Sequence, residues 1–269
     1  MRINPIKNNF YSPSFSSRKK EVKDADHILR RTKQVFPLVS PTYIDSFYGS
    51  IDISNPYAGS KSSRYVNAKQ DTITDIREMQ QFPSHYQDNL SDEDIQTPYG
   101  VTLSRIKKDK AGNCLENSIA ALTALYANGY TNSNLANVKL KVGFQNPETG
   151  EIDAVYYMPM DHSVAVTDMN KGGKKNIVID PWLNFADTKD RAIAKYKSMY
   201  EKREISEAKS WAKYYFGLEL ARKNSALKIS DYIPVVNFEL LENKDLEPEE
   251  IKKIQAYAKK HFEELLIKN

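Results

Sequence analysis

The feature that most constrains the fold is a change of hydrophobic period in the middle of the chain. Residues 113–129 carry apolar side chains every three or four positions, which is the period of a helix with one buried face. Four segments with strand character follow, mostly alternating apolar and polar residues: 138–144, 152–156, 162–167 and 176–180. Alternation is typical of half-buried strands. A helix followed by an antiparallel meander predicts an α+β fold.

Turn residues separate the predicted strands. The sequence from Asn146 to Gly150 predicts a turn of about five residues between the first two strands, which would form a hairpin. The glycine-containing segment 170–175 predicts a second turn before the last strand. Residues 231–236 predict a short edge strand, because the proline at position 234 is tolerated at a sheet edge.

The regions flanking the meander are predicted to be mainly helical. Residues 1–20 are polar, rich in serine and without a period, so we expect disorder there. Residues 21–100 are expected to be helical and irregular, and residues 101–269 to contain the core (101–187) and a helical extension. The periodicity predicts helices at 21–36, 72–82, 188–202, 205–223 and 248–267, irregular structure at 37–70, and a loop or linker at 83–100.

Composition excludes several classes of protein. A net charge of +4 over 269 residues is too small to argue for nucleic-acid binding. The single cysteine cannot form an internal disulfide. No apolar run approaches the roughly 20 residues that a membrane-spanning helix needs, and the first residues lack the apolar stretch of a cleaved signal peptide. We therefore expect neither a transmembrane segment nor conventional export.

The only cysteine, Cys114, lies at the start of the predicted helix 113–129. Asn113 is a favoured N-cap residue, and Glu116 follows at the spacing of a capping box. A thiol in the first turn lies at the positive end of the helix dipole, which favours the thiolate. Gly129 is the expected C-cap. This position suits Cys114 to act as a nucleophile.

Two further residues complete a candidate catalytic set. His162 lies at the start of one predicted strand and Asp180 at the end of the next, at similar distances from the turn at 170–175. Antiparallel pairing would therefore bring them together. His162 would accept the thiol proton and Asp180 would orient the imidazole, while backbone N–H groups at the helix start, including that of Cys114, would stabilise an oxyanion.

Each of these residues also has a purely structural interpretation. Cys114 could be a small core residue, His162 could bond to backbone, and Asp180 could cap a turn before Pro181. Trp182 could belong to the core. The three polar residues together, in this order, favour catalysis. No Cys/His spacing typical of metal ligands occurs, so we expect no metal and no cofactor.

Three short motifs resemble a known family. Gly112-Asn113-Cys114, Asp161-His162-Ser163-Val164 and Val178-Ile179-Asp180-Pro181-Trp182 resemble the Cys-His-Asp core of bacterial toxins and type III effectors with a papain-like or transglutaminase-like fold. The resemblance covers about residues 105–185 and is greatest to the glutamine deamidases, such as the catalytic end of the Pasteurella mitogenic toxin. It implies that Cys114 is the nucleophile, His162 the base and Asp180 the orienting acid. Asn113, Leu115 and Trp182 are the candidates for oxyanion stabilisation or substrate contact.

The resemblance also implies a function. It predicts an effector secreted through a type III-like route, with residues 1–20 as the address and a secretion chaperone as a partner there. In the host cytoplasm the protein would deamidate a glutamine of a host protein. A cysteine protease with the same triad, a transglutaminase, and a non-enzymatic binding module on a degenerate hydrolase fold are the alternatives. One departure is that residues 105–110 lack the oxyanion glutamine that papain-like enzymes often carry before the cysteine.

Overall fold

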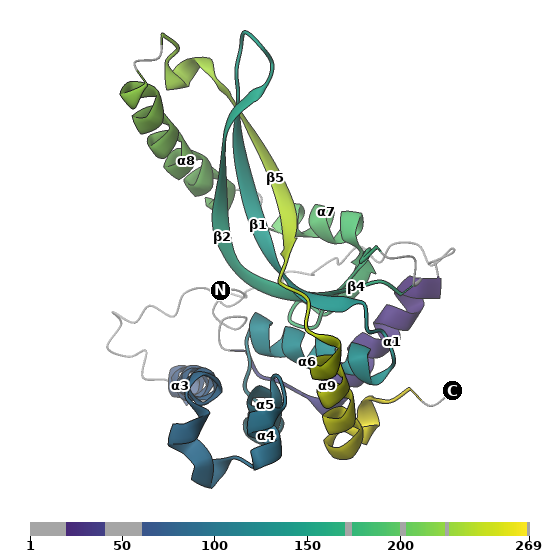
Figure 1. The fold of residues 1–269 in the computed structure, drawn as a ribbon. Coiled ribbons are helices and arrows are strands. Elements are labelled where there is room, and N and C mark those ends of the chain that lie inside the picture. Colours follow the sequence, from purple (N-terminus) through teal and green to yellow (C-terminus); the bar gives the residue numbers. More distant parts are fainter. Residues whose placement is uncertain (1–19, 41–60, 170–173, 200–202, 224–225, 268–269) are drawn as a thin grey trace, which may run out of the picture.

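The computed structural model describes residues 20–40, 61–169, 174–199, 203–223 and 226–267, which form one antiparallel sheet with helices on both faces (Figure 1). The α+β class predicted from the change of period is confirmed. Of the predicted disordered segment 1–20, only Lys20 is described, as the first residue of α1. Parts of the predicted irregular region (41–60) and of the second turn (170–173) also lie outside the described residues.

The elements follow one another along the chain in this order. The helices are α1 (Lys20–Val35), α3 (Lys61–Gln81), α4 (Asp92–Gln96), α5 (Gly100–Asp109), α6 (Cys114–Ala127), α7 (Lys189–Met199), α8 (Arg203–Arg222) and α9 (Pro248–His261). Short 3-10 helices cover Pro83–Asn89, Ile229–Asp231 and Glu263–Leu265. The strands are β1 (Ser133–Gln145), β2 (Ile152–Thr167), β3 (Ile177–Asp180), β4 (Phe185–Thr188) and β5 (Ile233–Glu242).

The five strands are arranged in the order β4-β3-β2-β1-β5, and all neighbours are antiparallel. The predicted hairpin between β1 and β2 is confirmed. The prediction of separate strands at 152–156 and 162–167 is wrong, because β2 continues through Pro159, which lies opposite Lys139 of β1. Proline can occupy a strand where its missing N–H would point away from the neighbouring strand. The edge strand predicted at 231–236 extends to Glu242, and β4 was not predicted.

The sheet separates two hydrophobic cores. α1, α6 and α9 contribute to the core on one face, and α7 and α8 to the core on the other. Because side chains alternate along a strand, Ala165 of β2 belongs to the first core, while Val164 and Val166 belong to the second. The helix predicted from residues 113–129 is α6, which is almost fully buried and belongs to the first core.

The helical prediction for the two ends of the chain is largely confirmed, with two corrections. The predicted loop or linker at 83–100 contains a 3-10 helix, α4 and the first residue of α5. Ser91 and Asp94 cap α4 reciprocally, and Tyr257 of α9 donates a hydrogen bond to Asp94. α4 contacts α9 through this bond and through Glu93, which pairs with Lys260 and His261. The prolines around these short helices concealed them in the sequence. α3 also begins at Lys61, well before the predicted start at residue 72.

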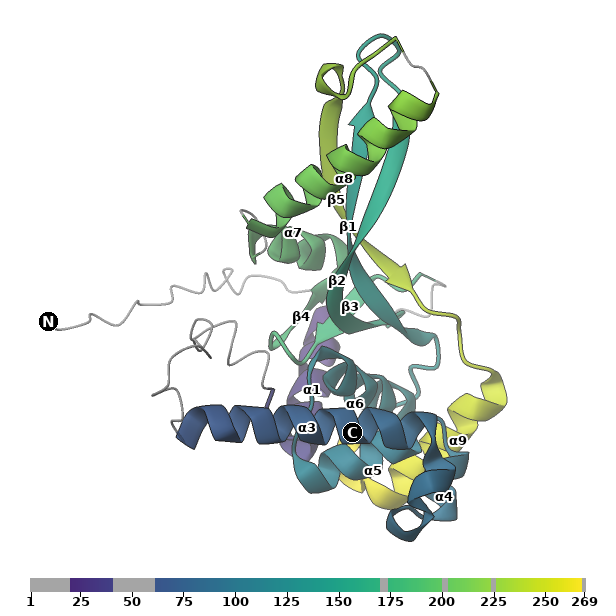
Figure 2. The same cartoon turned by 90° about the vertical axis from the view of Figure 1, so that its left-hand side faces the viewer.

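One part of the structure projects from the rest. β1, β2 and β5 extend beyond the short strands β3 and β4 to form an arm, and α8 lies along one face of it (Figures 1 and 2). α1, α5, α6 and α9 gather at the other end of the sheet (Figure 2). None of the helices within the described ranges combines the length and the apolar character needed to cross a bilayer.

Candidate functional site

α6 begins at Cys114, so the thiol lies in the first turn of an almost fully buried helix. The N-cap residue Asn113 has an extended backbone, and its N–H donates to Glu116 Oε2 over 2.9 Å, as expected from the predicted capping box. The preceding residue must be glycine, because a Cβ on Gly112 would lie 2.8 Å from Glu116 Cβ and 2.8 Å from Leu38 Cδ1. The glycine of the Gly-Asn-Cys sequence therefore lets the backbone pass close to Glu116 and Leu38 just before α6 begins.

His162 and Asp180 lie together, as their distances from the connecting turn predict. His162 Nε2 is 2.7 Å from Asp180 Oδ2, and both side chains are buried. β2 and β3 pair through Ala165 and Ile179. Continued by one residue, this register places Asp180 opposite Val164, which is two residues from His162, the spacing of a diagonal cross-strand pair. The geometric prediction is confirmed.

The Asp180 carboxylate is held by more than the histidine. Its side chain is fully buried, Tyr196 of α7 donates its hydroxyl proton to Oδ2 over 3.0 Å, and the N–H of Leu183 donates to Oδ1 over 2.9 Å. Two further hydrogen bonds restrict the rotation of the carboxylate. Asp180 is thus oriented to accept a hydrogen bond from the His162 ring at Nε2.

The electrostatics of the site differ from the expectation of an unperturbed histidine. Burial alone would lower the pKa of His162, but the Asp180 carboxylate and the hydrogen-bonded Cys114 side chain raise it to about 10. The imidazole is therefore protonated at neutral pH. The Cys114 side chain is therefore hydrogen-bonded to a positively charged ring that Asp180 holds through Nε2.

The start of α6 is connected directly to β2. Ser118 Oγ lies 2.7 Å from the carbonyl oxygen of Cys114 and 2.7 Å from that of Ser163. Its single proton can bond to one of these oxygens at a time. Since Ser163 follows His162, this contact holds the start of α6 against β2, the strand that carries His162.

A second connection runs through the residue after Asp180-Pro181. Trp182 lies beside His162, with 5.1 Å between the ring centroids. Its indole N–H donates to Ser40 Oγ over 2.7 Å, and Ser40 donates to Asn113 Oδ1 over 2.8 Å. Asn113 Nδ2 is also 3.4 Å from Gln70 Oε1 of α3. The residue before the cysteine and the aromatic ring beside the histidine are therefore linked through one hydroxyl.

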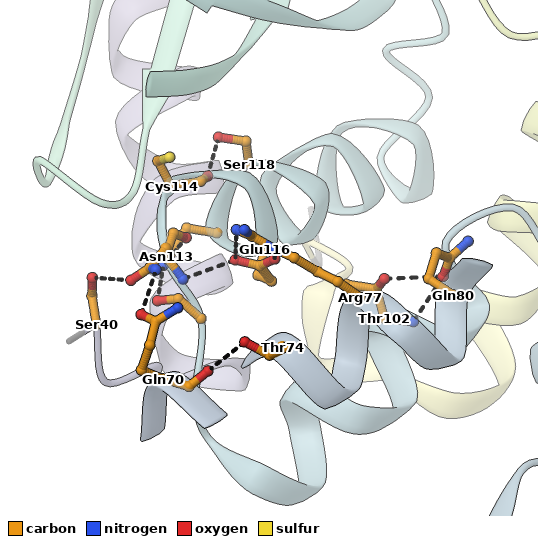
Figure 3. A network of polar contacts seen from close by, with 12 residues as sticks. Ser40, Gln70, Thr74, Arg77, Gln80, Thr102, Asn113, Cys114, Glu116 and Ser118 are labelled. Atoms are coloured by element: carbon orange, nitrogen blue, oxygen red, sulfur yellow. Dashed lines mark hydrogen bonds and ion pairs between the residues drawn. The ribbon is translucent and has the colours of Figure 1, made fainter. Parts of the chain in front are cut away.

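α3 holds the other side of the helix start (Figure 3). Arg77 donates to both carboxylate oxygens of Glu116, over 2.8 and 3.3 Å. The Glu116 side chain is 1 % exposed and that of Arg77 43 %. In Figure 3 the Cys114 sulfur points away from Arg77 and Gln70. The contacts with α3 thus hold the start of α6 on the side opposite the Cys114 sulfur.

The predicted site residues do not all lie in the site. Cys114, His162 and Asp180 are brought together. Trp182 lies beside His162, and Ser40 links Trp182 to Asn113, the residue before the cysteine. Leu115 instead packs, partly buried, against the core around α6, so its side chain is not directed at the thiol, although its N–H belongs to the helix start. Sequence reasoning missed Ser40, Gln70, Arg77 and Tyr196, which come from segments with no spacing that relates them to the cysteine.

Among the residues that the structure describes, no three His, Cys, Asp or Glu side chains group together as a metal site requires. In comparisons with known proteins, no family model, curated protein or solved structure matches the chain.

Proposed function

We propose that the protein is a cysteine hydrolase in which Cys114 is the nucleophile, His162 the acid–base residue and Asp180 the residue that orients the imidazole. The observation that carries this proposal is the buried 2.7 Å contact between His162 and Asp180, with Cys114 hydrogen-bonded to the same imidazole. Burying an Asp-His pair costs free energy, because both groups lose their hydration. Such pairs cluster at functional sites, and this one lies beside a thiol at a helix start, which supports a catalytic role.

The reaction follows from the protonation state of the pair. The Cys114 thiolate attacks a carboxamide or peptide carbonyl carbon, and the developing oxyanion is stabilised by N–H groups at the start of α6. The C–N bond breaks as the imidazolium of His162 gives its proton to the leaving nitrogen. A water molecule then loses a proton to His162 and attacks the thioester. The C–S bond breaks, which releases a carboxylic acid and restores the Cys114 thiolate beside the protonated His162.

Our preferred substrate is a glutamine side chain of a host protein, with ammonia as the leaving group. This choice depends on the resemblance of the three motifs, which contain Cys114, His162 and Asp180. The papain-like or transglutaminase-like core and delivery as a secreted bacterial effector depend on the same resemblance. A protease would use the same steps with a peptide amine as the leaving group. An amine in place of water would give transglutamination.

The experiment is incubation of the full chain with host-cell lysate, followed by peptide mass spectrometry. Conversion of glutamine to glutamate that requires Cys114 and His162 supports the proposal. His261→Ala is a matched control, because His261 also contacts a carboxylate, that of Glu93 over 3.0 Å, but on the exposed surface of α9. New peptide termini would assign a protease instead. If neither product depends on Cys114, the hydrolase proposal is wrong and a binding module remains.

A further inference from the structure

β2 has one edge that is only partly paired. β3 pairs with Ala165–Thr167, close to one end of the 16-residue strand. Within the described residues, no strand pairs with the same edge from Ile152 to Tyr157, although β1 pairs with the other edge throughout this part of the arm. An unpaired edge presents backbone N–H and C=O groups that can bind another extended chain.

The position of Pro159 shows which residues present these groups. Proline is accommodated in a strand where its missing N–H would point away from the partner. Pro159 lies opposite Lys139, directly after a register shift, and the pairing is regular from there to Phe144 and Ala154. Backbone direction alternates along a strand, so Tyr157 and Val155 also direct their N–H and C=O groups to the free edge. Both side chains are exposed, at 45 % and 40 %.

This edge leads to the candidate catalytic site. His162 lies five residues beyond Tyr157 on the same strand, a distance of about 16 Å at the rise of a β-strand. A chain paired with the edge would lie on the same side of β2 as β3, which pairs with β2 beyond His162. α8 packs on the face of the arm that carries Tyr156, whose hydroxyl donates to Glu219, whereas Val155 and Tyr157 alternate to the other face and are exposed.

We propose that the β2 edge from Ile152 to Tyr157 binds an extended segment of the protein substrate as an added β-strand and directs the following residues of that segment to Cys114. This inference depends on the proposed function for the identity of the occupant. The occupant is a segment with apolar, strand-forming side chains, because these would meet Val155 and Tyr157. Its reactive side chain would lie several residues from the paired part.

The test uses the full chain with Cys114→Ser, which retains the edge and removes turnover. The probe is a phage-displayed library of 16-residue peptides with a central glutamine. Val155→Pro removes one outward N–H from β2. Val236→Pro is the matched control on β5, because Pro234 shows by the same reasoning that position 236 faces the opposite edge of the sheet.

Selected peptides should bind at least about tenfold more weakly to the Val155→Pro variant and unchanged to the Val236→Pro variant. Hydrogen exchange on the chain without either proline substitution should show protection of the Val155 and Tyr157 amides on peptide binding, which tests the edge even if Val155→Pro fails to fold. No enrichment, equal binding by both variants, or protection elsewhere would overturn the proposal. A dimer that Val155→Pro dissociates would overturn it too, by assigning the edge to a second copy.

Iodoacetamide labelling of the chain with Cys114 intact separates this inference from the proposed function. A reactive Cys114 together with peptides that ignore the edge would refute the inference alone. Peptides that bind the edge of a chain whose thiol is inert would refute the hydrolase and retain a strand-binding surface.

Discussion

The ion pair between Arg77 and Glu116 gives a quantitative test of how α3 supports the start of α6. Glu116 is 1 % exposed and receives two bonds from Arg77 and one from the Asn113 N–H. Removing one partner of a buried pair costs ~3–5 kcal/mol. Because Arg77 is 43 % exposed, water screens the guanidinium, and the cost falls toward the ~1.5–3 kcal/mol of a hydrogen bond to a charged group. We expect Arg77→Met to lower the free energy of unfolding by about 2 kcal/mol.

The assay is urea unfolding at neutral pH of Arg77→Met, Glu116→Gln and the double variant. Glutamine keeps an oxygen for the Asn113 N–H but removes the charge, so the double variant should be more stable than the sum of the single effects predicts, by about 1–2 kcal/mol. Arg191→Met is the control, because Arg191 is 64 % exposed and 3.8 Å from Asp187; it should cost less than about 0.5 kcal/mol. Equal costs for the two arginine variants, or additive single effects, would refute the reasoning.

Two further predictions concern the charge and the packing of the site. The raised pKa of His162 stabilises the fold fully below about pH 6.5, and this contribution is lost as the pH rises through about 10. Asp180→Asn should reduce this loss of unfolding free energy between pH 6.5 and 10. Parallel profiles for the two chains would contradict the assignment. Gly112→Ala should cost about 1–3 kcal/mol in urea unfolding because its Cβ would meet Glu116 Cβ at 2.8 Å. Gly217→Ala on α8, with no atom within 4 Å of the new Cβ, should be neutral or stabilising; equal costs would show that crowding at Gly112 is unimportant.

Local patterns in the sequence predict the elements that carry the site. The three-and-four spacing after Asn113 predicts α6. The C-cap is Asn128 and not Gly129 as predicted; Gly129 follows it with a positive φ. The proximity of His162 and Asp180 follows from antiparallel pairing alone, without knowledge of the rest of the fold. These predictions succeed because each depends on residues close to one another in the chain or joined by one short connection.

The parts that sequence reasoning missed depend on long-range contacts. Tyr196 reaches Asp180 from α7, and Ser40 reaches Trp182 across 142 residues. No periodic signal relates such positions. The continuity of β2 through Pro159 was missed for a different reason, since whether a proline interrupts a strand depends on which side of it the neighbouring strand lies.

The central claim is that the buried imidazolium of His162 holds Cys114 as a reactive thiolate. The most direct measurement is the second-order rate of iodoacetamide alkylation of Cys114 at neutral pH, for the native chain, for His162→Ala and for His261→Ala as the control. We predict that the native thiol reacts faster than the same thiol in urea, that His162→Ala slows the reaction at least about tenfold, and that His261→Ala leaves it unchanged. A thiol that reacts only after unfolding, or at a rate independent of His162, would contradict the account.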